Sequence, residues 1–210
     1  MIEIEGFEPK TDNGWGIPII KRQRIAVKDI IPFNYIMSKP SYEKTVHFFL
    51  DDHEFERVWN HPSKYIKLLK KFHAVFSPDF SLWVEYPLVL KLWNTYRNRY
   101  IGAYWQSQGI RVIPTVGWSE EGTFDFCFAG VEKGSTVAIS TRGATHSSVE
   151  IEGFRYGYTE MLRRIKPERV IVYGTMKRIG KLKGNVVHIP YEFYINEECT
   201  GQPIPGKGGK

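Results

Sequence analysis

Acidic side chains follow two apolar runs of the sequence, at the points where the runs end. Asp51 and Asp52 come directly after TVHFFL (45–50), and Asp79 follows HAVF (73–76). If both runs are parallel strands of one sheet, their carboxyl ends meet at the same edge, where such folds hold their ligands. Carboxylates at that edge could bind a divalent cation through oxygen ligands, or share general acid and base roles. The sequence therefore predicts Asp52 and Asp79 as catalytic or metal-ligating residues.

Each of these carboxylates also has a purely structural interpretation. Asp52 precedes EFERVW and could cap a helix that begins there, whereas Asp79 precedes a turn that leads to a later helix. Hydrogen bonding within a loop is a common role for aspartate in such positions. The sequence leaves the structural and the chemical roles open at both positions.

Further polar side chains follow the other apolar runs. Arg142 lies in STRGATHSS (140–148), where glycine, exposed amides and a guanidinium suit a phosphate or carboxylate group. No G-x-x-x-x-G-K-[ST] or G-x-G-x-x-G sequence occurs, so an ordinary loop is the alternative. The expected ligand-binding residues are Ser77, Ser81, Thr115, Trp118, Thr141, Arg142 and Tyr173. The shortlist of strand-end residues also contains Asp51, His53, His146 and Thr175.

Two common reaction centres are not indicated. The serines lack a G-x-S-x-G turn, which argues against a serine hydrolase. Cys127 and Cys199 have neither a C-x-x-C spacing nor histidines at ligand spacing, so neither zinc nor a disulfide framework is expected. Cys127 lies in the apolar string FDFCFAG, which favours a buried, unreactive thiol.

An aromatic stripe runs along a predicted helix at 86–109. Its members recur three or four residues apart, at Trp93, Tyr96, Tyr100 and Tyr104, with Trp105 beside them. Together with Arg97 and Arg99, these rings could stack on nucleic-acid bases, but stripes at helical spacing are more typical of a core. In the core interpretation, Arg97 lies beside the packed face and Arg99 nearer to solvent.

Alternating strands and helices position these residues. The predicted strands are 24–28, 45–50, 73–76, 110–116, 136–140, 169–174 and 186–191, and the predicted helices are 64–72, 86–109 and 151–167, with a shorter one within 122–130. Strands that are apolar on both faces and separated by helices indicate a parallel sheet. The expected fold class is α/β, as a compact or incomplete TIM-like barrel, because eight units typically need about 250 residues. An open doubly wound sheet is the alternative.

The chain of 210 residues predicts one α/β domain at 23–195, after an irregular N-terminal arm (1–22) and before a Gly/Pro/Lys tail (196–210). Its formal charge of +6 favours anionic partners, including nucleic acid, although the basic residues are dispersed. The N-terminus lacks a signal-peptide pattern, and no apolar run approaches the length of a membrane span. We therefore expect a basic, cytoplasmic protein. The sequence leaves its oligomeric state open.

Several long strings resemble a known family. HFFLDDHEFERVWNHPSKYIKLLKKF, SPDFSLW, WNTYRNRYIGAYWQSQGIRVIPTVGWS, FDFCFAG and GYTEMLRRIKPERVIVYG are similar to the phage- and plasmid-associated domain of unknown function 4417. The resemblance runs from about residue 45 to residue 175. It implies a mobile-element setting in bacteria or archaea, and it carries no established catalytic residues.

These observations predict an α/β protein that binds an anionic ligand at the carboxyl ends of its strands. A nucleotide, a nucleic acid or a phosphate ester would satisfy that chemistry. One alternative is a metal-dependent hydrolase that acts on a phosphate ester through Asp52 and Asp79, while Arg142 steadies the anion. The other is a non-catalytic protein that binds another protein. A divalent cation is the one candidate cofactor, and the sequence does not decide whether the chain is an enzyme.

Overall fold

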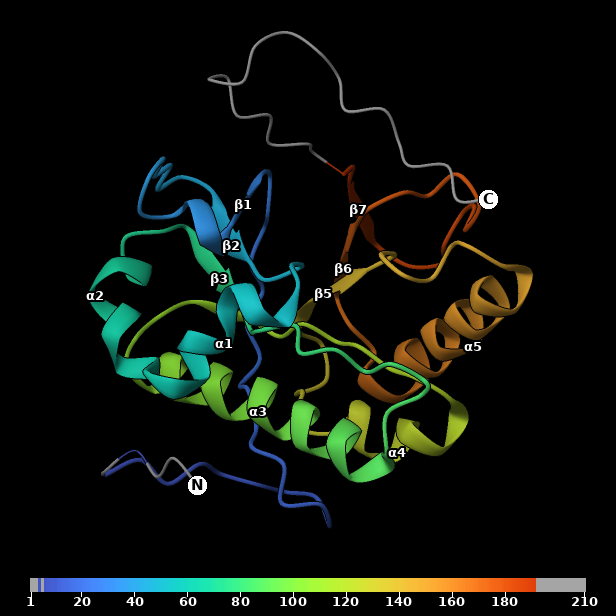
Figure 1. The fold of residues 1–210 in the computed structure, drawn as a ribbon, viewed down its shortest axis with the longest axis horizontal. Coiled ribbons are helices and arrows are strands. Elements are labelled where there is room, and N and C mark those ends of the chain that lie inside the picture. The colour runs from blue at the N-terminus through green and yellow to red at the C-terminus, as the bar shows by residue number, and fades with distance from the viewer. Residues whose placement is uncertain (1–3, 5, 192–210) are drawn as a thin grey trace, which may run out of the picture.

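The computed structural model describes residue 4 and residues 6–191, in which strands and helices alternate (Figure 1). The strands are β1 (Ile30–Pro32), β2 (Thr45–His47), β3 (Ala74–Phe76), β4 (Val112–Ile113), β5 (Thr136–Ser140), β6 (Arg169–Tyr173) and β7 (Val186–Ile189). The α-helices are α1 (Asp52–Asn60), α2 (Ile66–Leu69), α3 (Leu88–Ser107), α4 (Phe124–Cys127) and α5 (Ser148–Ile165). Short 3-10 helices cover Phe33–Tyr35, Pro62–Tyr65 and Glu121–Thr123.

Each named strand pairs in parallel with the strand next to it in the sequence. One sheet has the order β1-β2-β3-β4 and the other the order β5-β6-β7. A parallel bridge between Thr115 and Ala138 links the two sheets, and the Val116 N–H donates to the Ala138 carbonyl at 2.8 Å. The expected α/β class with parallel strands is confirmed. The carboxyl ends of all these strands consequently lie at one edge.

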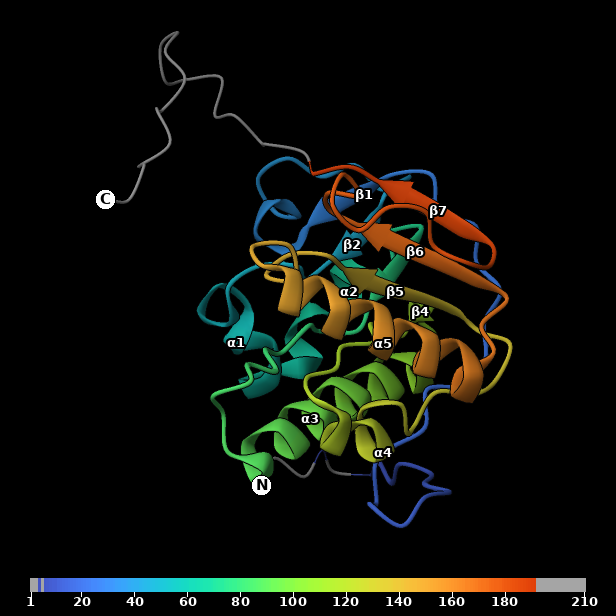
Figure 2. The ribbon, with the colours of Figure 1, turned by 90° about the vertical axis from the view of Figure 1, so that its right-hand side faces the viewer.

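The helices cover one face of this sheet, and side chains of the strands fill the other. Buried residues from α1 and α3 pack with β2, β3 and β4, while α5 packs with β5 and β6. Figure 2 shows α5 lying along these last strands. A third cluster draws on all the strands or on residues next to them, and it contains Ile30, Phe49, Ala74, Phe76, Ile113, Ala138, Ile171, Tyr173 and Ile189.

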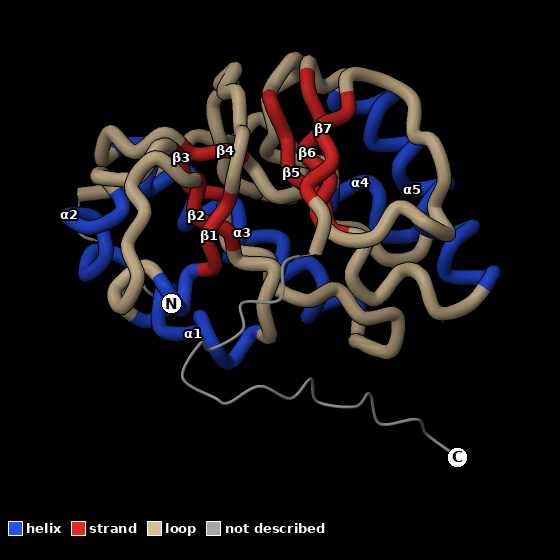
Figure 3. The backbone as a smooth tube through the Cα atoms, turned by 90° about the horizontal axis from the view of Figure 1, so that it is seen from above, coloured by secondary structure: helices blue, strands red, loops and turns tan. Residues whose placement is uncertain are grey.

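Closure into a barrel is not confirmed. No pairing joins β1 to β7 among the described residues, and Figure 3 shows the strands from above as two groups. The alternative of an open sheet fits this arrangement. The strand order nevertheless follows the sequence, and the helices lie on one face, whereas a doubly wound sheet carries helices on both.

The predicted strand at 24–28 is wrong, because β1 begins only at Ile30. The preceding segment crosses the amino ends of other strands. The Thr136 N–H donates to the Gln23 carbonyl at 2.9 Å, and the Arg169 guanidinium donates to the Ile25 carbonyl at 3.2 Å. Burial of Ile25 beneath the inner cluster explains the apolar pattern without a strand.

The two long helices form where the apolar periodicity predicts them. Pro87 precedes α3, and Gly109 follows it with φ of 84°, a left-handed conformation that suits a residue just beyond a helix end. Ser147 caps α5 through a capping box with Glu150. Lys166 ends α5 with φ of 48°, directly before a proline. Local sequence therefore determines both ends of the helices.

Candidate functional site at the carboxyl edge of the sheet

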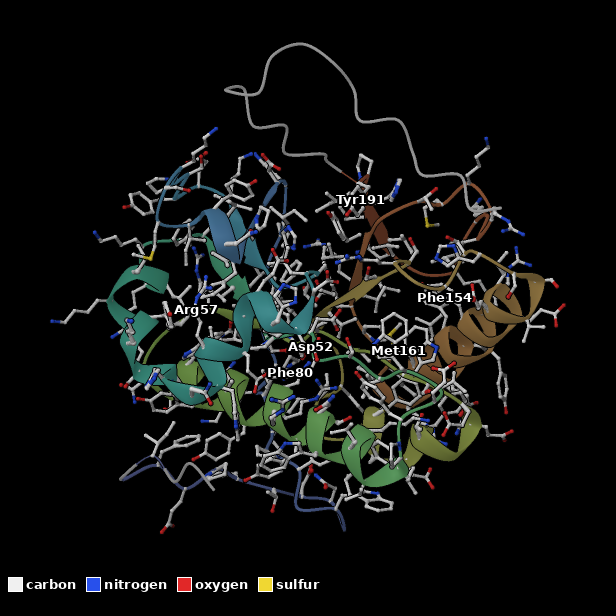
Figure 4. The ribbon with its side chains drawn as sticks, viewed as in Figure 1. Asp52, Arg57, Phe80, Phe154, Met161 and Tyr191 are labelled. Carbon is white, nitrogen blue, oxygen red and sulfur yellow. The ribbon has the colours of Figure 1, made fainter. Side chains whose placement is uncertain are left out.

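Asp52 fastens the loop after β2 to the loop after β3. Its carboxylate accepts a hydrogen bond of 2.8 Å from the Ser81 hydroxyl and bonds of 3.2 Å from the Ser81 backbone N–H. Figure 4 shows Asp52 beside Phe80, between α1 and α3. Asp51 occupies the cap position of α1, and its N–H donates to the Glu54 carboxylate at 3.4 Å. Helix capping by Asp52 is thus wrong, whereas loop hydrogen bonding by Asp52 is confirmed.

Asp79 is partly buried in the loop after β3, where its carboxyl group lies beside Gly117. Its pKa is raised to about 7, chiefly by burial and then by the negative charge of Asp52, while Arg142 and Arg99 oppose the increase. It does not cap a helix, because Pro87 stands at the cap position of α3. Asp79 therefore carries a proton for part of the time at neutral pH, next to a carboxylate held by hydrogen bonds.

Arg142 reaches from the loop after β5 to the loop after β2. Its Nη1 donates to the Phe49 carbonyl at 3.3 Å, and its Nη2 pairs with Asp51 Oδ1 at 3.1 Å. The side chains of this ion pair are 41% and 65% exposed. The guanidinium also acts electrostatically on His47 and Asp79. Arg142 thus interacts with three groups of the edge, through an ion pair with Asp51 and through its charge with His47 and Asp79.

His47 belongs to this site, although the sequence interpretation did not select it. The side chain is buried at the end of β2, where Nδ1 accepts from the Phe49 N–H at 3.2 Å. The proton of the neutral ring therefore lies on Nε2, which is buried without a hydrogen-bond partner among the described residues. Burial, followed by the charge of Arg142, lowers the pKa of His47 to about 3. The signal in the sequence was one ionisable residue inside the apolar run TVHFFL.

Three of the predicted ligand-binding hydroxyls hold the edge together. Ser77 Oγ donates to Asn98 Oδ1 at 2.7 Å, and Thr115 Oγ1 donates to the Ser77 carbonyl at 2.7 Å. Thr141 Oγ1 donates to the Thr175 carbonyl at 3.0 Å. Each of these hydroxyls already donates its proton to another group of the protein. Contact with a ligand stays a prediction for all three.

The two predicted aromatic residues of the site lie apart from each other. Trp118 packs on Phe154 of α5, with ring centroids 5.3 Å apart. Tyr173 stacks on Phe49 in the inner cluster, with centroids 5.2 Å apart and an interplanar angle of 8°. The structure thus brings Tyr173, but not Trp118, beside the ring of His47, whose centroid is 5.0 Å away.

The shortlisted histidines do not join the central groups. His53 is exposed on α1, and His146 is exposed just before α5. The backbone N–H of His146 donates to Glu150 at 2.7 Å. Both histidines are consequently surface residues of the elements that flank the edge.

Arg99 lies beneath the edge, and the expectation that it faces solvent is wrong. Its side chain is buried, and it donates to the carbonyls of Thr115, Cys127 and Ala129 at 2.8–3.1 Å and to Asn98 Oδ1 at 2.7 Å. Burial lowers its pKa to about 10. The guanidinium therefore stays charged at neutral pH and links α3 to the chain around α4.

The aromatic stripe of α3 is packing surface in its second half, whereas Trp93 at its start is exposed. Tyr100, Tyr104 and Trp105 are buried, as the core interpretation predicts. Cys127 is also buried, and burial raises the pKa of its thiol, which agrees with an unreactive cysteine. Cys199 lies outside the described residues.

Two cavities occur away from the edge. One, of about 680 Å³, lies between the N-terminal arm and the end of α3 and is lined by Phe7 and Tyr104, among others. The other, of about 400 Å³, lies beside α5 and is lined by Tyr158 and Leu182, among others. Across residues 4 and 6–191, no group of three or more His, Cys, Asp or Glu side chains is placed to hold a metal ion. The carboxyl edge is therefore distinguished by its side-chain chemistry.

Parallel strands, helices on one face and a polar carboxyl edge define an α/β protein whose candidate site lies at the ends of its strands. The chain belongs to the family described as Domain of unknown function (DUF4417), whose model matches residues 9–190. This match confirms the resemblance seen in the sequence and extends it at both ends.

The relatives are phage proteins. The Gene 1 protein of Mycobacterium phage L5 is 49% identical over 165 residues, which cover 79% of this chain and 72% of that protein. The Gene 1 protein of Mycobacterium phage D29 is 47% identical over 132 residues, which cover 63% of this chain and 49% of that protein. No solved structure matches. Within the described part of the chain, no helix is long and apolar enough to cross a membrane.

Proposed function

We propose that this phage-related protein binds a phosphate-bearing anion at the carboxyl edge of its sheet, with Arg142 as the main recognising group. The observation that supports this most directly is the exposed ion pair between Arg142 and Asp51. Exposed pairs of this kind contribute only about 0–1 kcal/mol, so a ligand can replace Asp51 at little cost. A guanidinium can then form two parallel hydrogen bonds with phosphate oxygens.

Two neighbouring groups add hydrogen-bond donors to the same region. Asp79, with a pKa of about 7, can donate its proton to an anionic oxygen when it is protonated. The Nε2–H of His47 is a buried donor with no partner among the described residues. Buried donors that lack partners are costly, and an acceptor supplied by a ligand would remove that cost. The donors at the edge thus favour an anion over a cation.

Metal-dependent hydrolysis of a phosphate ester through Asp52 and Asp79 is the second candidate. It is favoured by the electrostatic interaction between these two carboxylates, since Mg²⁺ is commonly held by one or two carboxylates and the phosphates of a substrate. The Ser81 hydrogen bonds to Asp52 and the proton on Asp79 both compete with a cation at these oxygens. Anion binding is therefore the stronger proposal.

A third candidate, the binding of another protein, has support only from exposed apolar side chains, which occur on many proteins. We place the anion-binding activity in the cytoplasm.

Calorimetric titration with pyrophosphate tests the proposal. Arg142→Gln should weaken binding at least about ten-fold, as expected for the loss of one charge-assisted contact of about 1.5–3 kcal/mol. Arg24→Gln is the matched control, because Arg24 also forms an exposed ion pair, with Glu168, but precedes β1 at the opposite end of the sheet. Equal losses in the two variants, or no binding by the unmodified protein at low salt, would rule out the site.

Two additional titrations separate the candidates. Sulfate keeps its charge across neutral pH, so tighter sulfate binding at about pH 6 than at about pH 8 would report the proton on Asp79. Binding of Mg²⁺ without any anion, lost in Asp52→Asn and retained in Arg142→Gln, would instead favour the metal-dependent alternative.

A further inference from the structure

Trp83 presents an aromatic ring beside the proposed anion site. It lies in the loop between β3 and α3, and its side chain is 52% exposed. The far edge of the indole faces Gly143, since a Cβ built at Gly143 would lie 3.6 Å from Trp83 Cζ3. Gly143 directly follows Arg142, and consecutive Cα atoms are only about 3.8 Å apart. The ring and the guanidinium can therefore reach the same small ligand.

Hydrogen bonds hold the loop that carries Trp83 both before and after this residue in the chain. On one side, Ser81 binds Asp52, and the Asn94 side chain donates to the Ser81 carbonyl at 2.7 Å. On the other side, Lys91 Nζ donates to the Val84 carbonyl at 2.9 Å. Figure 1 shows this loop crossing the molecule from α1 toward α4. The backbone on both sides of Trp83 is thus held in place before any ligand arrives, which reduces the entropy lost on binding.

An ion pair between buried Lys91 and half-exposed Glu120 adds to this second attachment. Lys91 is almost fully buried and pairs with Glu120, with Nζ 2.7 Å from Oε2. Glu120 belongs to the segment that follows β4, so the loop, α3 and the next strand end are joined by one ammonium group. Such a connection orients the loop rather than contributing chemistry of its own.

We infer that Trp83 stacks on the base of a nucleoside phosphate whose phosphate group is bound by Arg142. This inference rests on the proposed anion site and specifies its ligand class. Indole rings offer the best aromatic face for stacking, and each stacked base contributes regardless of its identity. Val84, the next residue in the chain, is also exposed and apolar, which suits a flat base rather than a second charged group. A free nucleotide and a nucleotide within a single strand share this chemistry.

Titrations with two matched phosphate monoesters test the inference. Adenosine monophosphate and methyl phosphate carry the same anionic group, and only the former carries a base. The unmodified protein should bind adenosine monophosphate about ten-fold more tightly, because a stacked base contributes about 1–3 kcal/mol. Trp83→Ala should remove that difference while leaving the affinity for methyl phosphate unchanged. Arg142→Gln should weaken the binding of both.

Two further variants keep the test decisive. Trp15→Ala removes another exposed tryptophan, which packs on Phe126 and not on the edge, and it should preserve the affinity difference. Trp83→Phe keeps a stacking ring and should bind adenosine monophosphate nearly as well, while losing the tryptophan fluorescence change on binding. This variant serves as the readout if Trp83→Ala does not fold.

The outcomes separate the inference from the proposed function. Equal affinities for the two esters in the unmodified protein would overturn stacking on Trp83 and leave the anion site intact. If the unmodified protein binds neither ester and does not bind pyrophosphate, both the anion site and the stacking on Trp83 are overturned. A preference for a short oligothymidylate over adenosine monophosphate, lost in Trp83→Ala and weakened by salt, would support the inference and assign the base to a single strand.

Discussion

Asp52 and Ser81 form a double hydrogen-bonded connection across two strand ends. The carboxylate receives both the hydroxyl proton, at 2.8 Å, and the backbone N–H of Ser81, at 3.2 Å. Because Asp52 begins α1 and Ser81 follows β3, this connection sets the position of α1 relative to the chain that carries Asp79 and Trp83. It also holds in place the negative charge that, after burial, contributes to the raised pKa of Asp79.

Removal of the Asp52 carboxylate should destabilise the fold measurably. In Asp52→Ala, the N–H and the hydroxyl of Ser81 lose their acceptor, at an expected cost of about 1–3 kcal/mol for the partly buried donors. Asp125→Ala is the control, because Asp125 forms an exposed ion pair with Arg164 that should contribute at most about 1 kcal/mol. Urea denaturation of both variants measures the difference, and equal losses would show that the Asp52 connection is unimportant for stability.

The titration of Asp79 should make stability depend on pH. Its pKa is 3.8 in the unfolded reference and about 7 in the folded protein, so the folded protein retains a proton that the unfolded chain has already lost between these values. The contribution of this proton is present in full below the unfolded pKa and is lost as pH rises through about 7. The free energy of unfolding should therefore decrease between about pH 4 and pH 7.

Asp79→Asn isolates this effect, because the amide does not titrate. Relative to the unmodified protein, the variant should gain stability at about pH 8, by up to about 4 kcal/mol for a shift of this size, and should gain little at about pH 4. Urea denaturation at both pH values provides the comparison. A gain of the same size at both pH values would mean that Asp79 is not protonated in the folded state. Asp125→Asn again serves as an exposed control.

The parallel arrangement was predictable because it depends on short-range patterns. The run TVAIS is apolar on both faces, and β5 has the predicted bounds at Thr136–Ser140. The segment 24–28 misled the prediction, since its buried residues contact the ends of other strands rather than a neighbouring strand. Periodicity reports burial, and burial alone does not identify the partner.

The sequence predicted where the candidate site lies, at the carboxyl ends of the strands. It predicted only some of the side chains that form the site. Asp52 and Asp79 follow adjacent strands, so parallel topology alone brings them together. His47 was not predicted as a site residue. It is distinguished by a buried Nε2 without a hydrogen-bond partner among the described residues, and the sequence does not show how the chain packs around that atom. Arg99 was assigned to solvent because helical periodicity cannot show that loop carbonyls on other elements surround a guanidinium.

Arg99 should be far more important for stability than an exposed arginine. Arg99→Met leaves the carbonyls of Thr115 and Cys127 without their donors and should cost about 3 kcal/mol or more. Arg99→Lys should recover only part of this loss, because an ammonium lacks the planar fork that serves acceptors in several directions. Arg163→Lys, at an exposed position on α5, is the control. Urea denaturation should rank Arg99→Met lowest, and near-normal stability of that variant would contradict the buried network.

Two glycines of α5 should respond in opposite directions to the same substitution. An alanine Cβ at Gly157 would overlap the indole of Trp118, whereas a Cβ at Gly153 would meet nothing within 4 Å. Both positions lie inside the helix, where alanine is normally favoured over glycine by about 0.5–1 kcal/mol. Gly153→Ala should therefore raise the free energy of unfolding by roughly that amount.

At Gly157 the steric term opposes the gain in helix propensity. Trp118 is packed between Phe128 and Phe154, so its ring has little room to move away from a new methyl group. Overpacking of this kind typically costs about 1–3 kcal/mol, which exceeds the propensity gain, and Gly157→Ala should be destabilised. Thermal and urea denaturation of the two variants supply the test, with Gly153→Ala as the matched control. Stabilisation of both variants would mean that Trp118 does not pack against α5 as the structure places it.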